Sequence, residues 1–249
     1  MLMLDSHCHL DRYATPNAVA AKASERGVFT IAVTNLPSHF RTGLPHVQNL
    51  PRIRLALGLH PLAADEHGYE LKLFRESLPL TSFVGEVGLD FSREGKDTRD
   101  TQLASFRFVA EYIACGQKVV SLHSRGAESV VLDILIEFNV PLVVFHWYSG
   151  PLRVLDEAVS QGHFFSVNPA MVRSEKGQQI IAQIPPDRLL TETDGPYVRN
   201  GRLPAQPWDI VLVENHLSHV WAIRPEEVRS RVWSNFRQML GRLGLIMLA

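Results

Sequence analysis

The fold is decided by residues 119–167, which read VVSLHSRGAESVVLDILIEFNVPLVVFHWYSGPLRVLDEAVSQGHFFSV. Short apolar runs alternate here with longer amphipathic runs, at 119–122, 126–137, 142–145, 151–161 and 164–167. The short runs are rich in Val, Leu and Phe on both faces, as in parallel strands that are covered on both sides. The stretch therefore predicts strands that alternate with helices in a parallel sheet.

The same alternation extends over the whole chain. The other predicted strands are 3–5, 29–34, 53–59, 82–87 and 189–191. The other predicted helices are 16–26, 37–48, 66–76, 99–115, 173–183, 208–221 and 225–243. Eight strand–helix units in 249 residues predict an α/β (β/α)8 TIM barrel, which typically needs about 250 residues. A doubly wound open sheet is the alternative.

Domain organisation follows from the lack of breaks in this pattern. Residues 1–249 show no linker, low-complexity tract or short-period repeat, so we expect one domain. Residues 195–208 are rich in Pro and Gly and are expected to form a long loop after the last strand.

The composition excludes several classes of protein. The chain is 45% hydrophobic and 20% charged, which excludes wholesale disorder. Its net charge of −1 excludes binding to nucleic acid through bulk charge, so any contact with DNA must come from a local patch. Two cysteines, Cys8 and Cys115, exclude a disulfide-rich fold and a four-cysteine zinc site. We find no signal-peptide pattern and no apolar run of about 20 residues, so we expect a cytoplasmic protein without a membrane segment.

Six of the predicted strands are followed by histidine or acidic residues. These residues are His7 and His9, His60, Glu86, His123, His146 and Asp194. Because the carboxyl ends of barrel strands meet at one face, we expect the side chains to lie together there. His7 and His9 are two positions apart, so on extended backbone they point to the same side and can chelate one metal, while Cys8 points away. Taken alone, a pair of this spacing is equally compatible with an ordinary structural role.

Two carboxylates complete the candidate site. Glu86 lies between Gly85 and Gly88, which permit close approach of backbone or substrate. Its carboxylate can bridge two cations or bond to a neighbouring loop. Asp194 is preferred to Glu192 as a metal ligand or proton acceptor, because it falls at the very end of the last strand.

The donor set predicts the chemistry. Nitrogen and oxygen ligands without a thiolate suit Zn²⁺, Mn²⁺ or Mg²⁺. Six ligands exceed what one tetrahedral ion takes, so we expect two divalent ions about 3.5–4 Å apart, bridged by Glu86. Such a pair activates water and stabilises the attacking and leaving oxygens of a displacement. The set therefore predicts metal-dependent hydrolysis.

Four further residues are candidates for substrate contact. Arg125 lies on the same rim as His123, and its guanidinium suits a phosphate oxygen. His60 either contacts a phosphate or supports a metal ligand. Trp147 and Tyr148 either stack on a base or cap the barrel.

These residues lie in six motifs that resemble those of the TatD family. The motifs are DSHCHLD at 5–11, GLHP at 58–61, GEVGLD at 85–90, HSR at 123–125, HWYSG at 146–150 and TDGPY at 193–197. They occur in the family's order and at its spacing. The family comprises metal-dependent deoxyribonucleases with a TIM-barrel fold, related to the amidohydrolases.

The resemblance implies roles for the matching positions. It implies one metal held by His7, His9, Glu86 and Asp194, and a second held by His123, His146 and the bridging Glu86. Asp194 would also accept a proton from the attacking water. The implied activity is hydrolysis of DNA phosphodiester bonds, often from a 3′ end, with Mg²⁺, Mn²⁺ or Zn²⁺. The implied partner is DNA that is single-stranded or has free ends.

Other segments bear on the branch of the family. Residues 199–207, RNGRLPAQP, stand where a longer basic loop is usual, which leaves the choice of substrate open. Segments 168–177, 191–197 and 207–209 resemble the QatD branch, the TatD-like component of the Qat anti-phage defence system, and this implies other Qat subunits as partners. Two alternatives stay open. One is a hydrolase of small amide, ester or phosphate substrates, and the other is a barrel that mainly binds partners in a defence complex.

Overall fold

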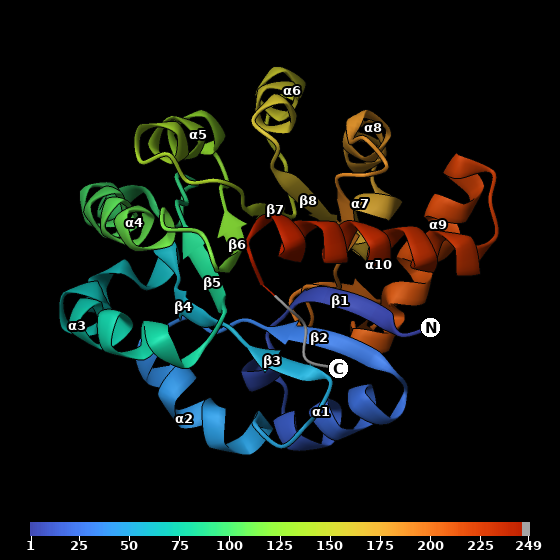
Figure 1. Cartoon of the computed structure of the whole chain (residues 1–249), viewed down its shortest axis with the longest axis horizontal. Coiled ribbons are helices and arrows are strands. Elements are labelled where there is room, and N and C mark those ends of the chain that lie inside the picture. The colour runs from blue at the N-terminus through green and yellow to red at the C-terminus, as the bar shows by residue number, and fades with distance from the viewer. Residues whose placement is uncertain (246–249) are drawn as a thin grey trace.

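The computed structural model describes residues 1–245, and in it a ring of strands is surrounded by helices (Figure 1). The neighbouring strands of the ring pair in parallel. The strands are β1 (Met3–Cys8), β2 (Val28–Ala32), β3 (Ile53–Leu55), β4 (Leu57–Leu59), β5 (Phe83–Gly88), β6 (Val119–His123), β7 (Val144–His146), β8 (Phe164–Val167) and β9 (Leu189–Thr191).

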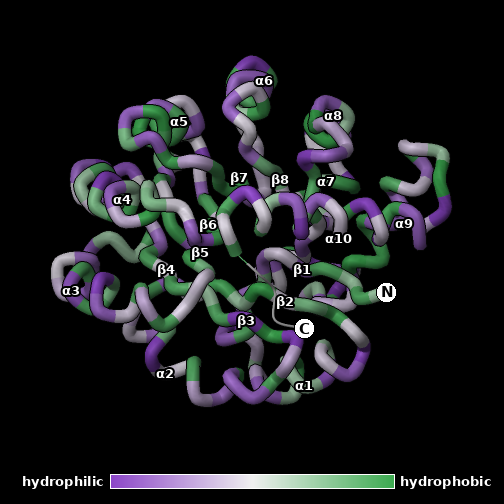
Figure 2. The backbone as a smooth tube through the Cα atoms, viewed as in Figure 1, coloured by the Kyte–Doolittle hydropathy of each residue, from purple (hydrophilic) through white to green (hydrophobic). Residues whose placement is uncertain are grey.

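The helices bury one face each against the strands. In α6, for example, Val154, Leu155 and Ala158 are buried. Hydrophobic and hydrophilic residues accordingly alternate along the helices in Figure 2. The helices are α1 (Pro16–Glu25), α2 (Pro37–Val47), α3 (His67–Ser77), α4 (Arg99–Ile113), α5 (Glu128–Glu137), α6 (Leu152–Ser160), α7 (Pro169–Arg173), α8 (Glu175–Gln183), α9 (Ile210–Trp221) and α10 (Pro225–Arg242). Within residues 1–245, none of them is both long enough and apolar enough to cross a membrane.

The strands close into a ring at two junctions. Hydrogen bonds join β1, β2 and β3 in one sheet and β4 to β9 in another. At the junction of the two sheets between β3 and β4, the backbone N–H of Ala56 donates to the Ala32 carbonyl at 2.8 Å. On the other side, the N–H of Asp194 donates to the His7 carbonyl at 2.9 Å. The predicted (β/α)8 TIM-barrel-like fold is therefore confirmed, and the open-sheet alternative is wrong.

The predicted strand 53–59 is two strands, β3 and β4, which are separated at Ala56 and pair with β2 and β5 respectively. A Cβ atom on Gly58 would lie 1.6 Å from the carbonyl oxygen of Thr34. That oxygen accepts the N–H of Glu86 at 3.1 Å, so it reaches past β4 to β5. Only a residue without a side chain fits beneath such a contact.

Two other predictions are corrected. The predicted helix 173–183 is observed as α8, which begins two residues later because the Ser174 side chain caps it, and a short helix that was not predicted, α7, precedes it with Asn168 as its cap. The predicted loop 195–208 contains a small antiparallel hairpin, formed by β10 (Arg199–Asn200) and β11 (Leu203–Pro204).

Helix α10 covers one junction at the amino ends of the strands. Its Trp233 indole donates to the Leu2 carbonyl just before β1, and its Asn235 amide donates to the Leu189 carbonyl of β9 at 2.8 Å. The ring of Phe29 in β2 lies 5.7 Å from that of Trp233. The helix thus supports the end of the barrel opposite the predicted site.

Candidate active site

The carboxylate of Glu86 lies at the centre of five imidazole rings, and its side chain is only 2% exposed. Its two oxygens face different rings. Oε2 lies 3.5 Å from His7 Nε2, 3.2 Å from His9 Nε2 and 3.2 Å from His60 Nε2. Oε1 lies 2.5 Å from His123 Nδ1 and 3.0 Å from His146 Nε2. One acid from β5 thus contacts rings from four other strand ends.

The first strand contributes two neighbouring rings. His7 Nε2 and His9 Nε2 are 3.2 Å apart, and each lies 3.6 Å from Asp194 Oδ1. Cys8 points away from them, with its Sγ 3.5 Å from the Gly195 carbonyl. The two-residue period of a strand therefore has the effect that the sequence predicted.

The spacing of these atoms fits a metal ion. Two ligands bound at about 2.0–2.1 Å in tetrahedral geometry lie about 3.3–3.4 Å apart. The distances among His7, His9, Asp194 and Glu86 given above run from 3.2 to 3.6 Å. Nitrogen atoms that face one another at this separation beside carboxylate oxygens are the arrangement of a ligand set. The residues present therefore fit a divalent cation.

Polar groups behind the rings fix their orientation. Ser121 Oγ lies 2.7 Å from His7 Nδ1, which leaves Nε2 as the atom that faces Glu86. Asp90 Oδ2 lies 2.8 Å from His123 Nε2 in the same way. Each ring thus presents one defined nitrogen to the carboxylate.

Glu192 is the corresponding group behind His146. Its Oε1 lies 3.5 Å from His146 Nδ1, and the residue is fully buried. The same oxygen accepts the N–H of Trp147 at 3.0 Å and the amide of Asn168 at 3.1 Å. Its other oxygen accepts the hydroxyl of Ser166. The residue set aside in favour of Asp194 is therefore a buried part of the same cluster.

The electrostatics of the cluster set its charge. Burial alone raises the pKa of Glu86, but His60 and the other rings outweigh it and hold that pKa well below its usual range. Burial, together with His146, lowers the pKa of His7 to about 3. Burial raises the pKa of Asp194 to about 7, although His146 acts in the opposite direction. Burial lowers the pKa of His146 and His123, but Glu86 outweighs it and raises both, so without metal the carboxylate and these two rings share protons that a metal ion would displace.

A cavity of about 630 Å³ opens above the cluster. Arg125 lines it with a side chain that is 57% exposed, and its only acidic contact among residues 1–245 is Glu94 at 3.6 Å. Trp147 and Tyr197 also line it, and the ring of Tyr197 packs edge-on against His9 at 4.9 Å. The cavity thus combines a cation, two aromatic rings and the buried cluster at its base.

Tyr148 lies outside this cavity. It is 1% exposed, packs against Phe145 and Phe165, and donates its hydroxyl to the Pro151 carbonyl at 2.7 Å. The interpretation of Tyr148 as a base-stacking residue is therefore wrong, because its ring is buried in the apolar packing beside β7 and β8. The backbone of Trp147 has φ of 38°, a sharp reversal that sends the two neighbouring side chains to opposite sides.

The structure brings all six predicted metal ligands into one cluster, but it pairs some of them differently. Possible three-residue ligand groups join His123 with His60 and Glu86, and His146 with His7 and Glu192. His60, which was expected to contact a phosphate or to support a metal ligand, lies next to the predicted ligand Glu86, with 3.2 Å between its Nε2 and Glu86 Oε2.

Three residues without a predicted role also line the site or hold it, namely Ser121, Tyr197 and Asn35. The role of Ser121 could have been predicted, because it precedes His123 by two positions on one strand and therefore points to the same face.

Fold and site together define a barrel with a histidine- and carboxylate-rich centre suited to divalent metal. Residues 4–241 match the model of the family described as TatD related DNase, so the chain belongs to that family. It is 27% identical to deoxyribonuclease TATDN3 of Homo sapiens over 97% of this chain and 95% of that protein. It is 25% identical to the uncharacterized metal-dependent hydrolase MJ1582 of Methanocaldococcus jannaschii, over 93% of this chain and 94% of that protein.

Solved structures agree. The TatD homologue YJJV of Escherichia coli K12 superposes with a TM-score of 0.79 at 25% identity, covering 98% of both chains. A TatD family hydrolase of Entamoeba histolytica gives 0.81 at 20% identity, covering 96% of this chain and 98% of that one. The family match and the names of these relatives support the prediction of a metal-dependent hydrolase.

Proposed function

We propose that the protein is a metal-dependent deoxyribonuclease that hydrolyses phosphodiester bonds in DNA. The observation that carries this proposal is the position of Glu86, which divides its two oxygens between two sets of imidazoles at the base of an open cavity. The family to which the chain belongs, and the names of relatives such as the human deoxyribonuclease, support DNA as the substrate.

The division of the carboxylate supports two metal positions. His7, His9 and Asp194 would hold one ion with Glu86 Oε2, and His123 and His146 would hold the other with Oε1. Divalent ions bound there would supply Lewis acidity that activates water and stabilises charge on the phosphate. Zn²⁺, Mn²⁺ and Mg²⁺ all suit this donor set.

The remaining steps belong to side chains of the cavity. A carboxylate oxygen of Asp194 accepts the proton of the attacking water, because this acid lies beside the cluster and at the cavity floor. The guanidinium of Arg125 binds a non-bridging phosphate oxygen, and the ring of Trp147, which is 37% exposed, stacks on a base. His60 holds Glu86 from the cavity side.

The test compares wild-type protein with Glu86→Ala on single-stranded and nicked DNA in the presence of Mn²⁺ or Mg²⁺. We expect cleavage by the wild-type protein, loss of cleavage in the variant, and two metal ions per chain by elemental analysis. Cys115→Ser is the control, because Cys115 is exposed and precedes the amino end of β6, whereas His123 lies at the carboxyl end of that strand. Undiminished cleavage by Glu86→Ala would refute the bridging role.

The alternatives have their own outcomes in the same experiment. Faster turnover of a small amide, ester or phosphate substrate than of DNA would favour the small-substrate hydrolase. Less than one metal ion per chain, together with stable co-purification of other subunits, would favour a partner-binding barrel. The association with a Qat-type defence system, predicted from segments such as 168–177, stays a prediction.

A further inference from the structure

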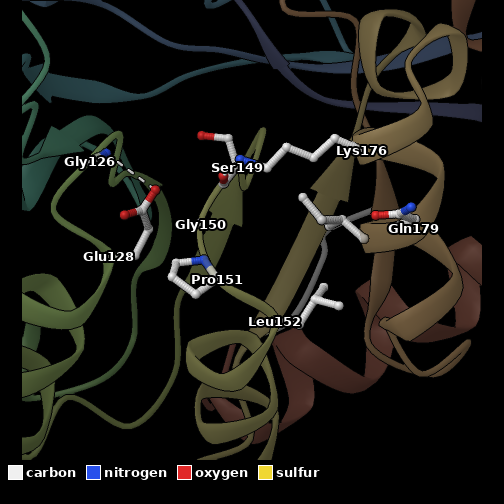
Figure 3. A pocket seen from close by; sticks show the side chains of 9 residues that line it. Gly126, Glu128, Ser149, Gly150, Pro151, Leu152, Lys176 and Gln179 are labelled. Atoms are coloured by element: carbon white, nitrogen blue, oxygen red, sulfur yellow. Dashed lines mark hydrogen bonds between the residues drawn. The ribbon is translucent and has the colours of Figure 1, made fainter.

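A second cavity adjoins the catalytic one and has no role in the proposed reaction. It measures about 460 Å³ and lies between the start of α5, the turn after β7 and the start of α8 (Figure 3). Ser149 lines both cavities. Because Ser149 follows His146 by three residues, their Cα atoms are at most about 10 Å apart. The second cavity is thus within reach of the next part of a chain-like substrate.

The two walls of this cavity differ in chemistry. On one wall, the amino group of Lys176 extends toward the turn and donates to the Ser149 carbonyl at 2.5 Å (Figure 3). On the other, the carboxylate of Glu128 accepts the N–H of Gly126 at 3.2 Å. An anionic group is therefore attracted to the Lys176 side and repelled from the Glu128 side. Between them, Leu152 offers apolar surface to a base or sugar.

Three arginines continue the positive charge beyond Lys176. Arg173 ends α7 and donates to the Arg199 carbonyl at 2.8 Å, and Arg199 donates to the Arg202 carbonyl at 2.9 Å. Backbone carbonyls, and not acids, thus hold the guanidinium groups together. Both α7 and the hairpin follow carboxyl ends of strands, β8 and β9, so they lie on the same face of the barrel as the site.

These four exposed cations, Arg173, Lys176, Arg199 and Arg202, form what we call the cationic strip. None of them lies within 4.0 Å of an acidic side chain in the described part of the chain, residues 1–245. The exposed Glu175 lies between Arg173 and Lys176 in the chain, so this region holds four cations and one acid, a positive departure from the net charge of −1 of the whole chain. Such a patch is the electrostatic footprint of a polyanion.

We infer that the cationic strip and the cavity at Ser149 bind the backbone of a DNA strand beside the bond that is cut. Lys176 holds the phosphate next to the scissile one, and the three arginines hold phosphates further along the strand. The inference rests on the proposed nuclease function. It adds that the substrate is a DNA strand several nucleotides long.

The direct test is binding without catalysis. A fluorescein-labelled single-stranded oligonucleotide is titrated with protein in EDTA over a series of KCl concentrations, and anisotropy gives the affinity. Each phosphate contact on a single strand contributes about 0.7 to the steepness with which log K falls as log salt rises. At 0.1 M salt, loss of one such contact therefore weakens binding about fivefold. We therefore expect about 25-fold weaker binding by Arg173→Gln/Lys176→Gln, and a salt slope that is about 1.4 smaller.

The matched control is Lys72→Gln, because Lys72 is also exposed, on α3, and its one acidic contact among residues 1–245 is Glu76. Equal binding by wild-type protein and the double variant, or an equal loss in the control, would overturn the inference. With Mn²⁺ present, the ratio of kcat/KM for the oligonucleotide to kcat/KM for a dinucleotide should fall in the double variant through KM. If wild-type protein cleaves neither substrate, the proposed function fails, while the binding measurement still decides whether the strip holds DNA.

Discussion

The substitution Glu192→Gln tests how the cluster is held. Glu192 Oε1 accepts hydrogen bonds from Trp147 and Asn168 and lies 3.5 Å from His146 Nδ1. A glutamine carbonyl can keep the first two bonds, and its amide nitrogen can donate to the hydroxyl of Ser166, which is the partner of Oε2. The change therefore preserves shape and most hydrogen bonds, but removes the negative charge behind His146.

The magnitude follows from this role. Loss of a carboxylate that orients a metal-binding histidine typically weakens metal affinity by 10- to 100-fold. At about 1.36 kcal/mol per decade, this corresponds to about 1.4–2.7 kcal/mol of binding free energy. The free energy of unfolding of the metal-free protein should fall by only about 1 kcal/mol, because the replaced hydrogen bonds become neutral but are not lost.

The assay is competition for Zn²⁺ with a chromophoric chelator at neutral pH, beside urea unfolding of the metal-free protein. Glu214→Gln is the control, because Glu214 is equally buried but lies on α9 and pairs with Arg229. It should lower stability without changing metal affinity. Wild-type affinity in Glu192→Gln would refute the role of Glu192 in orienting His146.

Three further predictions concern stability. Gly58→Ala should cost about 3 kcal/mol or more in urea unfolding, because its Cβ would overlap the Thr34 carbonyl. Arg229→Met should lower the free energy of unfolding by about 3 kcal/mol, because it leaves the Glu214 carboxylate, which is 2% exposed, without its partner. The double variant Arg229→Met/Glu214→Gln should recover part of this loss, because the buried charge is then removed as well. Burial lowers the pKa of His163 to about 4 from 6.5, so the folded state resists protonation there. Stability should thus be lost as pH falls from 6.5 to 4, by about 3 kcal/mol more in wild-type protein than in His163→Gln.

Each of these predictions has a clear contrary result. Gly68→Ala is the control for Gly58, because nothing lies within 4 Å of a Cβ there, and equal stabilities of the two variants would refute the crowding argument. If the double variant Arg229→Met/Glu214→Gln is no more stable than Arg229→Met, the unpaired charge of Glu214 does not cause the loss of stability. Parallel pH profiles for wild-type protein and His163→Gln would exclude His163 as a source of acid sensitivity.

The sequence predicted the barrel well because its strands are buried on both faces. Runs such as 119–122 and 164–167 carry apolar residues on both faces and one serine each, and several of them in alternation with helices are typical of a covered parallel sheet. Boundaries were predicted less well where side-chain caps decide them. Ser174 caps α8 two residues after the expected start of that helix, and Asn168 caps the short α7, which was not expected; such caps act through local hydrogen bonds that periodicity does not register.

The cluster could be predicted because its members share one position in the repeating unit. His7, Glu86 and His146 each come from a strand's carboxyl end, and closing the barrel brings such positions together whatever the details of packing. The fine geometry could not be predicted in this way. Trp147 and Tyr148 are adjacent in the sequence, yet one lines the cavity and the other is buried, because the backbone reverses at Trp147.

The least regular parts of the barrel are also the parts that build the site. The Thr34 carbonyl accepts the N–H of Glu86, and the Thr34 N–H donates to the Gly85 carbonyl, both at 3.1 Å, so Thr34 binds both polar atoms of the peptide unit that precedes Glu86. The same contact lies at the junction of the two sheets, where β3 pairs with β2 and β4 pairs with β5. A regular ladder would place Glu86 by the ordinary register of β5, whereas this contact fixes it independently of its neighbours. Departures of this kind are expected where function, and not stability, determines the backbone, and here they mark the residue on which the whole cluster depends.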